Sequence, residues 1–270
     1  MTGLTEPNAV AQHQSVGFGE GFDYTAGSPH LRHRALRAKV VAACQAAVRD
    51  VLDRDGRCRV LEVGAGHGTF TEHVAALGAE VWVTEMSPAS ADFLARRFVH
   101  NDRVHVVHDP DGTAGARGPE VDVVLAVSVL HHIPDYVGAV EALLPRIAPG
   151  GAFVSYQDPL WYPRRSRLSF AVDRGAYFAW RVTRGDLLRG VASLGRRLRH
   201  AHDPENPSDM VEYHVVRQGV DEQALVAALA PHFASVEVDR YWSTQAGWLQ
   251  SAGERIGPRT TFGITATGRV

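Results

Sequence analysis

The sequence predicts an α/β fold built on a doubly wound sheet, and three observations carry this prediction. Short strand-like segments rich in valine alternate along the chain with segments of helical periodicity. A glycine-rich turn follows the first of these strands, and the fourth is apolar enough to be buried on both faces of a parallel sheet. The composition agrees, because 270 residues that are 45% hydrophobic and 21% charged suit a globular protein with a full core.

The predicted elements follow one another in the order that such a sheet requires. Helical periodicity comes first, over residues 31–52. Strands are then predicted at residues 59–63, 80–84, 104–107, 121–127, 152–156, 235–241 and 261–267. Helices are predicted between them at residues 70–77, 88–98, 136–147 and 222–229. Gly78 marks the end of the first of these helices, and Ser87 followed by Pro88 marks the start of the second.

The regular alternation stops between Pro159 and Val220, where arginine and aromatic residues are frequent. We predict four parts: an N-terminal arm and cap helix (1–57), an α/β core (58–159), a lid insertion (160–220) and the C-terminal part of the core (221–270). Residues 161–200 contain ten arginines and two acidic residues, and an apolar helical stripe runs through 186–199. This pattern is typical of a lid helix packed on the sheet, and also of a segment that contacts an anionic membrane or covers an acidic or lipid-like substrate.

Charge and cysteine content exclude several classes of protein. The chain has 28 basic and 30 acidic residues, so its charge of −2 gives no reason to expect nucleic-acid binding. Cys44 and Cys58 cannot form a disulfide framework or a four-cysteine zinc site, and no other residues have convincing metal-ligand spacing. No signal peptide and no apolar run of membrane-spanning length is visible. We therefore expect a cytoplasmic protein without a metal.

The strongest chemical signal is the segment Val60-Leu-Glu-Val-Gly-Ala-Gly-His-Gly68, a strand that runs into a turn with alternate glycines. Glycines there let the backbone approach a ligand and leave amide groups at a helix N-terminus to bind it. Glu85 follows the second strand, twenty-one residues after Gly64, where a carboxylate can accept hydrogen bonds from both hydroxyls of a ribose. The dinucleotide fingerprint does not fit, because its third glycine would fall at Thr69.

The spacing Glu-x-Gly-x-Gly-x-Gly resembles motif I of class I S-adenosylmethionine-dependent methyltransferases, and the resemblance extends over residues 58–157. His108-Asp109-Pro110 matches the segment after the third strand, Asp122–Asp135 resembles motif IV of the small-molecule branch, and Leu143–Gly151 resembles the turn before the fifth strand. Only residues 112–119 depart from the pattern, because they lack the usual apolar residues against adenine. The resemblance implies a seven-stranded sheet that is mostly parallel, with the last strand antiparallel.

The resemblance also implies a cofactor and the residues that bind it. S-adenosyl-L-methionine would bind and leave as S-adenosyl-L-homocysteine, with no metal. An arginine of the N-terminal arm, Arg32 or Arg34, would hold the cofactor carboxylate. The other implied positions are the turn residues Gly64, Ala65 and Gly66, Glu85 at the ribose, Asp109 at the adenine and Ser128 near the amino-acid tail.

Two adjacent histidines, His131 and His132, follow the fourth strand, where the methyl group should point. A histidine there can accept a proton at neutral pH. In phosphoethanolamine methyltransferases the residue equivalent to His131 works with an N-terminal tyrosine, for which Tyr24 is the candidate here. His132 is as readily a packed residue at the start of the next helix. The candidate substrate contacts are His132, Tyr156, Asp158 and His214, although His214 also fits a surface position.

These residues predict an enzyme that moves a methyl group to a small-molecule or lipid-like acceptor. Oxygen is favoured over carbon and nitrogen as the methylated atom. The enzyme is expected to act in specialised (natural product) or lipid metabolism. A methyltransferase of DNA bases would need a Pro-Pro-aromatic or Pro-Cys motif where Ser128-Val-Leu-His131 stands. Two alternatives stay open: an enzyme that binds the cofactor but catalyses a cyclisation or elimination, and a membrane-associated binding protein that uses residues 161–200. The sequence predicts no particular acceptor and no oligomeric state.

Overall fold

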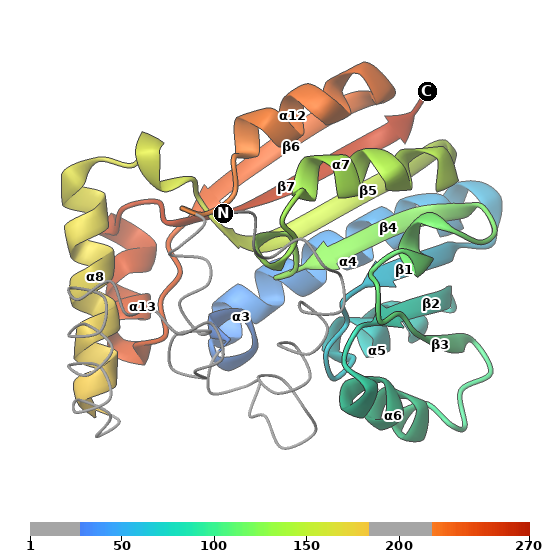
Figure 1. The fold of residues 1–270 in the computed structure, drawn as a ribbon, viewed down its shortest axis with the longest axis horizontal. Helices are drawn as coiled ribbons and strands as arrows, with labels where there is room; N and C mark the ends of the chain where they lie inside the picture. The colour runs from blue at the N-terminus through green and yellow to red at the C-terminus, as the bar shows by residue number, and fades with distance from the viewer. Residues whose placement is uncertain (1–27, 184–217) are drawn as a thin grey trace, which may run out of the picture.

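The computed structural model describes residues 28–183 and 218–270, with the side chains of all these residues except 181–183. A seven-stranded sheet lies between two layers of helices (Figure 1), in the strand order β3-β2-β1-β4-β5-β7-β6. Strands β1 to β5 run parallel, and β7 is antiparallel to both β5 and β6. The predicted doubly wound sheet is confirmed. The strands are β1 Arg59–Val63, β2 Glu80–Glu85, β3 Val104–His108, β4 Val121–Val127, β5 Ile147–Pro159, β6 Phe233–Tyr241 and β7 Thr261–Arg269.

The helices mostly lie where periodicity predicts them, with three differences. The helix predicted over 136–147 ends at Leu143, because Pro145 has no N–H to continue it, and β5 then begins at Ile147. Two helices were not predicted: one between β6 and β7, and one over Arg167–Thr183 in the predicted lid insertion. The α-helices of the described ranges are α3 Pro29–Arg32, α4 Arg34–Asp55, α5 Thr69–Ala75, α6 Pro88–Arg97, α7 Tyr136–Leu143, α8 Arg167–Thr183, α12 Glu222–Leu229 and α13 Gly247–Ile256.

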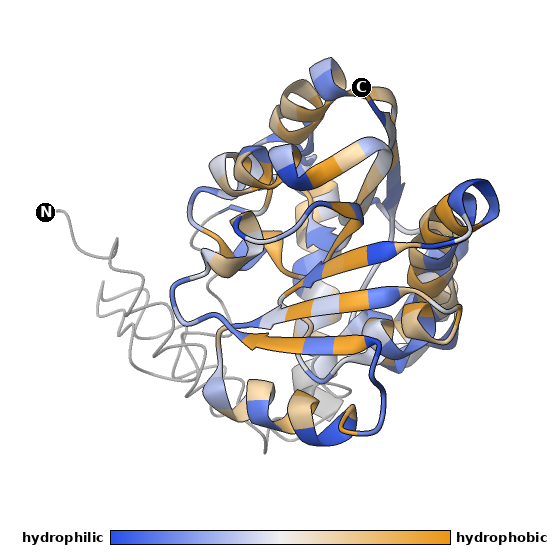
Figure 2. Cartoon of the chain, turned by 90° about the vertical axis from the view of Figure 1, so that its right-hand side faces the viewer, coloured by the Kyte–Doolittle hydropathy of each residue, from blue (hydrophilic) through white to orange (hydrophobic). Residues whose placement is uncertain are grey.

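The sheet is packed on both faces by apolar side chains. On one face, buried residues of α4, α5 and α6 form a cluster with alternate residues of β1, β2, β4 and β5. On the other face, α7 and α12 cover a second cluster that includes Phe153 and Phe262. All seven residues of β4 are buried, as expected for a strand covered on both sides. Figure 2 shows these largely hydrophobic strands between helices of mixed hydropathy.

A β-bulge near the end of β5 changes which face its last side chains occupy. The pairing of β5 with β7 shifts register between Tyr156 and Asp158, and Gln157 takes a left-handed φ of 71°. The Gln157 N–H donates to Tyr241 Oη (3.0 Å), and its Nε2 donates to Ser243 Oγ (2.7 Å), which stabilises this conformation. A regular strand would place residue 158 on the same face as Tyr156. The bulge instead directs the Asp158 carboxylate toward the opposite face.

Gly263 of β7 lies directly against the Tyr156 ring, where an added Cβ would come within 2.4 Å of the ring carbons. We expect Gly263→Ala to lower the free energy of unfolding by about 1–3 kcal/mol, because neither the sheet nor the buried ring can move away. Urea unfolding of the full chain measures this loss. The matched control is Gly175→Ala in α8, where a Cβ meets open space and alanine favours the helix. Equal losses in the two variants would contradict this account of the packing.

Candidate active site

The predicted glycine turn and the predicted residues Glu85, Asp109, Ser128, His131 and Asp158 lie at or just beyond the ends of parallel strands. The turn after β1 carries three glycines in the left-handed region: Gly64 (φ 64°), Gly66 (φ 57°) and Gly68 (φ 77°). A Cβ at Gly64 would lie 2.4 Å from the Val129 side chain, and one at Gly68 would lie 2.6 Å from the Phe98 ring. Both the conformation and the close packing therefore require glycine, and the turn stays thin enough for a ligand to approach its backbone.

Glu85 at the end of β2 is held against this turn by backbone donors. Gly66 N donates to one carboxylate oxygen (2.9 Å) and Ser87 N donates to the other (3.1 Å). Burial raises the pKa of Glu85, and backbone hydrogen bonds from Ser87, Gly66 and Met86 oppose the rise. Both oxygens accept from backbone donors, and a carboxylate has about four acceptor sites. The arrangement therefore fits the two hydroxyls of a ribose.

Asp109 lies beside Glu85 at the end of the neighbouring strand, since Asp109 N donates to Glu85 O (2.9 Å). The buried Asp109 carboxylate accepts hydrogen bonds from Thr113 N and Ala114 N, both at 3.0 Å. It thereby fixes the start of the loop that follows β3, which is the expected adenine side.

Arg146 stabilises the same loop through hydrogen bonds. This contact was not predicted from the sequence. Its buried guanidinium donates to Pro119 O (2.8 and 3.1 Å) and to Gly115 O (2.6 Å). Burial lowers the pKa of Arg146. The loop lacks the usual apolar residues, and four hydrogen bonds from Arg146 to its carbonyl groups order it instead. The only signal in the sequence was a lone arginine after Pro145, which does not reveal its contacts.

His131 and Asp158 form a buried pair between the ends of β4 and β5. His131 Nδ1 lies 2.7 Å from Asp158 Oδ1, which also accepts the His131 N–H at 3.1 Å. Ser155 Oγ donates to the other oxygen, Asp158 Oδ2, at 2.9 Å. The carboxylate assigns the imidazole proton to Nδ1, so the lone pair that can take up a proton is on Nε2. Asp158, which was predicted to contact the substrate, is thus the hydrogen-bond partner of His131.

Three further polar residues surround this pair. Ser128 has a left-handed φ of 59°, and its N–H donates to Tyr156 O (2.7 Å), so it turns sharply out of β4. The His132 ring lies 4.0 Å from the His131 ring. His30 of α3, which sequence reasoning missed, stacks on Phe70 at 5.8 Å. Burial, with a smaller contribution from His131, lowers the pKa of His30 to about 3.

Other candidates lie elsewhere or outside the described residues. Tyr156 packs in the cluster under α4, stacked on Tyr241 at 6.3 Å, so its ring is part of the core. Arg32 and Arg34 are exposed near the start of α4. Tyr24 and His214, like the predicted helix over 186–199, lie outside the described residues, and their roles stay predictions.

Within residues 28–183 and 218–270, no group of three histidine, cysteine or acidic side chains is arranged to hold a metal ion. In the same ranges, no helix is both long enough and apolar enough to span a bilayer.

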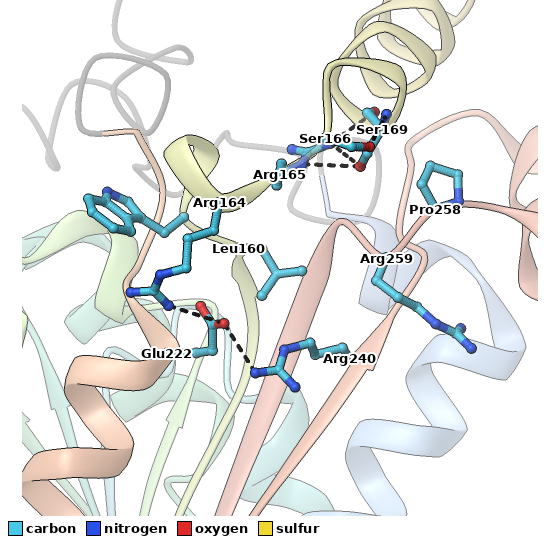
Figure 3. Close-up of a pocket in the computed structure, with 10 residues that line it drawn as sticks. Leu160, Arg164, Arg165, Ser166, Ser169, Glu222, Arg240, Pro258 and Arg259 are labelled. Atoms are coloured by element: carbon cyan, nitrogen blue, oxygen red, sulfur yellow. Dashed lines mark hydrogen bonds and ion pairs between the residues drawn. The ribbon is translucent and has the colours of Figure 1, made fainter.

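A separate cavity of about 310 Å³ lies beyond the end of β5, next to the start of α8 (Figure 3). Arg164 and Arg240 both direct their guanidinium groups to Glu222, at 3.4 and 3.2 Å. Arg164 also pairs with Asp221, and Arg165 pairs with Asp173 at 2.9 Å. Arg164 thus links the start of the 160–220 segment to α12, and Glu222 of α12 also pairs with Arg240 of β6. Contact of residues 161–200 with a substrate or a membrane stays a prediction.

Comparison with known proteins identifies the central part of the chain. Residues 61–153 match the family model described as "Methyltransferase domain". This stretch, from within β1 to within β5, is therefore similar to a methyltransferase domain. Over 119 residues it is 34% identical to a ubiquinone biosynthesis O-methyltransferase of Alkalilimnicola ehrlichii, covering 43% of this chain and 45% of that protein. The corresponding protein of Psychrobacter cryohalolentis is 31% identical over 36% of this chain and 39% of its own. The chain thus spans less than half the length of these curated relatives.

Solved methyltransferase structures share the whole fold at low sequence identity. The plantazolicin methyltransferase BpumL, solved with S-adenosyl-L-homocysteine, gives a TM-score of 0.56 at 13% identity and covers 97% of this chain and 95% of its own. The N-methyltransferase NodS of Bradyrhizobium japonicum gives 0.53 at 12% identity over 97% and 98%. These similarities support the fold of the methyltransferase domain and do not determine its acceptor.

The raised pKa of the buried residue Glu62 predicts that the stability of the fold depends on pH. Its carboxyl group is buried, accepts a hydrogen bond from Thr71 Oγ1 (2.6 Å), and burial raises its pKa from 4.5 to about 7. A raised folded-state pKa means that the native protein binds this proton more tightly, so stability falls as pH rises from 4.5 to 7. The expected loss is on the order of 3 kcal/mol.

The variant Glu62→Gln keeps the shape of the side chain and an oxygen that accepts from Thr71, but it does not titrate. Urea unfolding at pH 5 and pH 8 should show a smaller loss of stability in the variant than in the wild type. Parallel losses in the two proteins would show that Glu62 does not carry this pH dependence.

Proposed function

We propose that this chain is an S-adenosylmethionine-dependent O-methyltransferase that acts on a small-molecule or lipid-like acceptor. The observation that carries the proposal is the buried His131–Asp158 pair with its Nδ1–Oδ1 contact of 2.7 Å. A hydroxyl group is a weak nucleophile until it loses its proton, so a positioned general base contributes most when the acceptor atom is oxygen. The names of the curated relatives, which specify O-methylation in ubiquinone biosynthesis, also support oxygen.

The proposal gives each of these residues a part in the reaction. The bound cofactor supplies a methyl group that is already activated on a sulfonium. The turn at 64–68 and the Glu85 carboxylate would bind its ribose side, and Asp109 would face the adenine. His131 Nε2 would remove the proton of the acceptor hydroxyl, while Asp158 keeps the ring oriented and stabilises the imidazolium that forms. Binding in a near-attack geometry would supply about 7–11 kcal/mol, and the base a further ~10²–10⁴-fold in rate.

Glu85→Ala tests the cofactor half of the proposal. The variant removes the carboxylate that would accept both ribose hydroxyls, so affinity for S-adenosyl-L-homocysteine should fall by about 10- to 100-fold. Isothermal titration calorimetry measures this directly. Glu141→Ala, the same change at an exposed position of α7, is the matched control and should bind like wild type. Unchanged affinity in Glu85→Ala would refute the placement of the ribose.

His131→Ala and Asp158→Asn test the catalytic half. The assay incubates the protein and a cell extract with cofactor that carries a labelled methyl group, then separates aqueous small molecules, organic-soluble molecules and macromolecules. We expect label in one of the two small-molecule fractions, and a rate that is about 10²–10⁴-fold lower in His131→Ala. Asp158→Asn should also be slow, because an amide no longer favours the required tautomer or the imidazolium.

His132→Ala is the control for this experiment and should lose much less activity, because its neighbour keeps the contact with Asp158. Cofactor affinity should be unchanged in all three variants. Transfer at the wild-type rate in His131→Ala would show that no base is needed and would favour a nitrogen or carbon acceptor. Cofactor binding with no label in any fraction would argue for a reaction other than methyl transfer.

A further inference from the structure

His30 has a buried nitrogen that lacks a partner. The side chain is 5% exposed, and its Nδ1 makes no hydrogen bond within the part of the chain that the structure describes. A buried polar atom without a partner costs about 1–3 kcal/mol, so such atoms are rare in native proteins and call for a specific explanation. No charge interaction offsets the cost here, because burial keeps this imidazole neutral.

The position of His30 relates it to two parts of the candidate active site. Its ring stacks on Phe70, the second residue of α5, which follows directly on the glycine turn of β1. It is also near enough to His131, after β4, for that ring to contribute to the lowered pKa of His30. A neighbouring residue holds the backbone here, since His33 Nε2 contacts Thr244 O at 2.8 Å. His30 therefore lies where the ends of β1 and β4 meet.

The strand order indicates which end of the cofactor reaches this point. Along the order β3-β2-β1-β4, the edge of the sheet presents Asp109, then Glu85, then the glycine turn, then His131. A nucleoside bound with its adenine at Asp109 and its ribose at Glu85 extends its third part toward β1 and β4. In the proposed cofactor this third part is the sulfonium and the amino acid.

We propose that His30 binds the amino-acid end of the cofactor through Nδ1, an inference that rests on the function proposed above. A neutral histidine suits this place. It can hydrogen-bond the ammonium or the carboxylate of the amino acid, and it adds no positive charge beside a sulfonium. The arginines predicted for this contact, Arg32 and Arg34, are exposed, whereas His30 of the same segment is buried against the site.

The test compares two ligands that differ only at the end assigned to His30. S-adenosyl-L-homocysteine carries the amino acid, and 5′-methylthioadenosine shares its nucleoside and thioether but lacks the amino acid. His30→Phe preserves a ring that can stack on Phe70 and removes both nitrogens. By calorimetry, we expect this variant to bind S-adenosyl-L-homocysteine about 10-fold or more weakly and 5′-methylthioadenosine within about twofold of wild type.

His33→Phe, a change to the other histidine of this segment, is the matched control and should not distinguish the two ligands. His30→Gln, which restores a donor and an acceptor, should recover part of the affinity for S-adenosyl-L-homocysteine. If His30→Phe does not fold in a thermal unfolding test, His30→Gln and His30→Ala provide the same comparison.

Equal weakening of both ligands in the His30 variant, or no weakening of either, would overturn the inference. Failure of the proposed function gives a different result. If the proposed cofactor is wrong, the wild-type protein binds neither ligand; if only the transfer step is wrong, the ligand comparison at His30 is unchanged and the labelled-methyl assay shows no label in any fraction.

Discussion

The candidate active site depends on one buried carboxylate. Asp158 is fully buried, and within the described residues no lysine or arginine contacts it. A charge in that position is stable only if hydrogen-bond donors surround it, and the chain supplies three: Ser155 Oγ, the His131 N–H and His131 Nδ1. Two of the three donors come from one residue. The same carboxylate therefore fixes both the backbone that leaves β4 and the orientation of the imidazole ring on it.

The geometry of the carboxylate depends in turn on a distortion of the sheet. Asp158 reaches Ser155 because the bulge at Gln157 shifts its side chain to the other face of β5. The strained φ of Gln157 persists because Tyr241 and Ser243, on the far side of the sheet, hydrogen-bond its backbone and side chain. Packing at the antiparallel edge, far from the glycine turn in sequence, thus determines how the His131 ring, the proposed base, is oriented.

This dependence explains which parts of the site could be predicted from sequence. The glycine turn and Glu85 are local: a strand, a tight turn and one further strand position them, and their spacing along the chain reports their spacing in space. The contact between His131 and Asp158 joins two different strands and depends on the β-bulge. Regular alternation along β5 would place residue 158 on the face of Tyr156, away from His131, and the sequence does not reveal the bulge. His30 is more distant still. Its chemistry arises from burial by elements that the sequence does not bring together, and its own sequence context, Ser28-Pro-His-Leu-Arg32, predicts only a helix start.

Charge gives a reason for pairing the base with a carboxylate. At rest the pair carries one negative charge if His131 is neutral, and it becomes neutral overall when His131 accepts the proton of an acceptor hydroxyl. In the proposed reaction the methyl donor changes from a sulfonium to a thioether over the same step, so one positive charge disappears as another forms on the imidazole. The total charge of the buried site is then the same before and after transfer. In a region of low dielectric a change in total charge would be expensive, whereas a shift of charge over a short distance next to a fixed carboxylate costs far less. A base held by Asp158 therefore suits a cationic methyl donor better than an isolated histidine would.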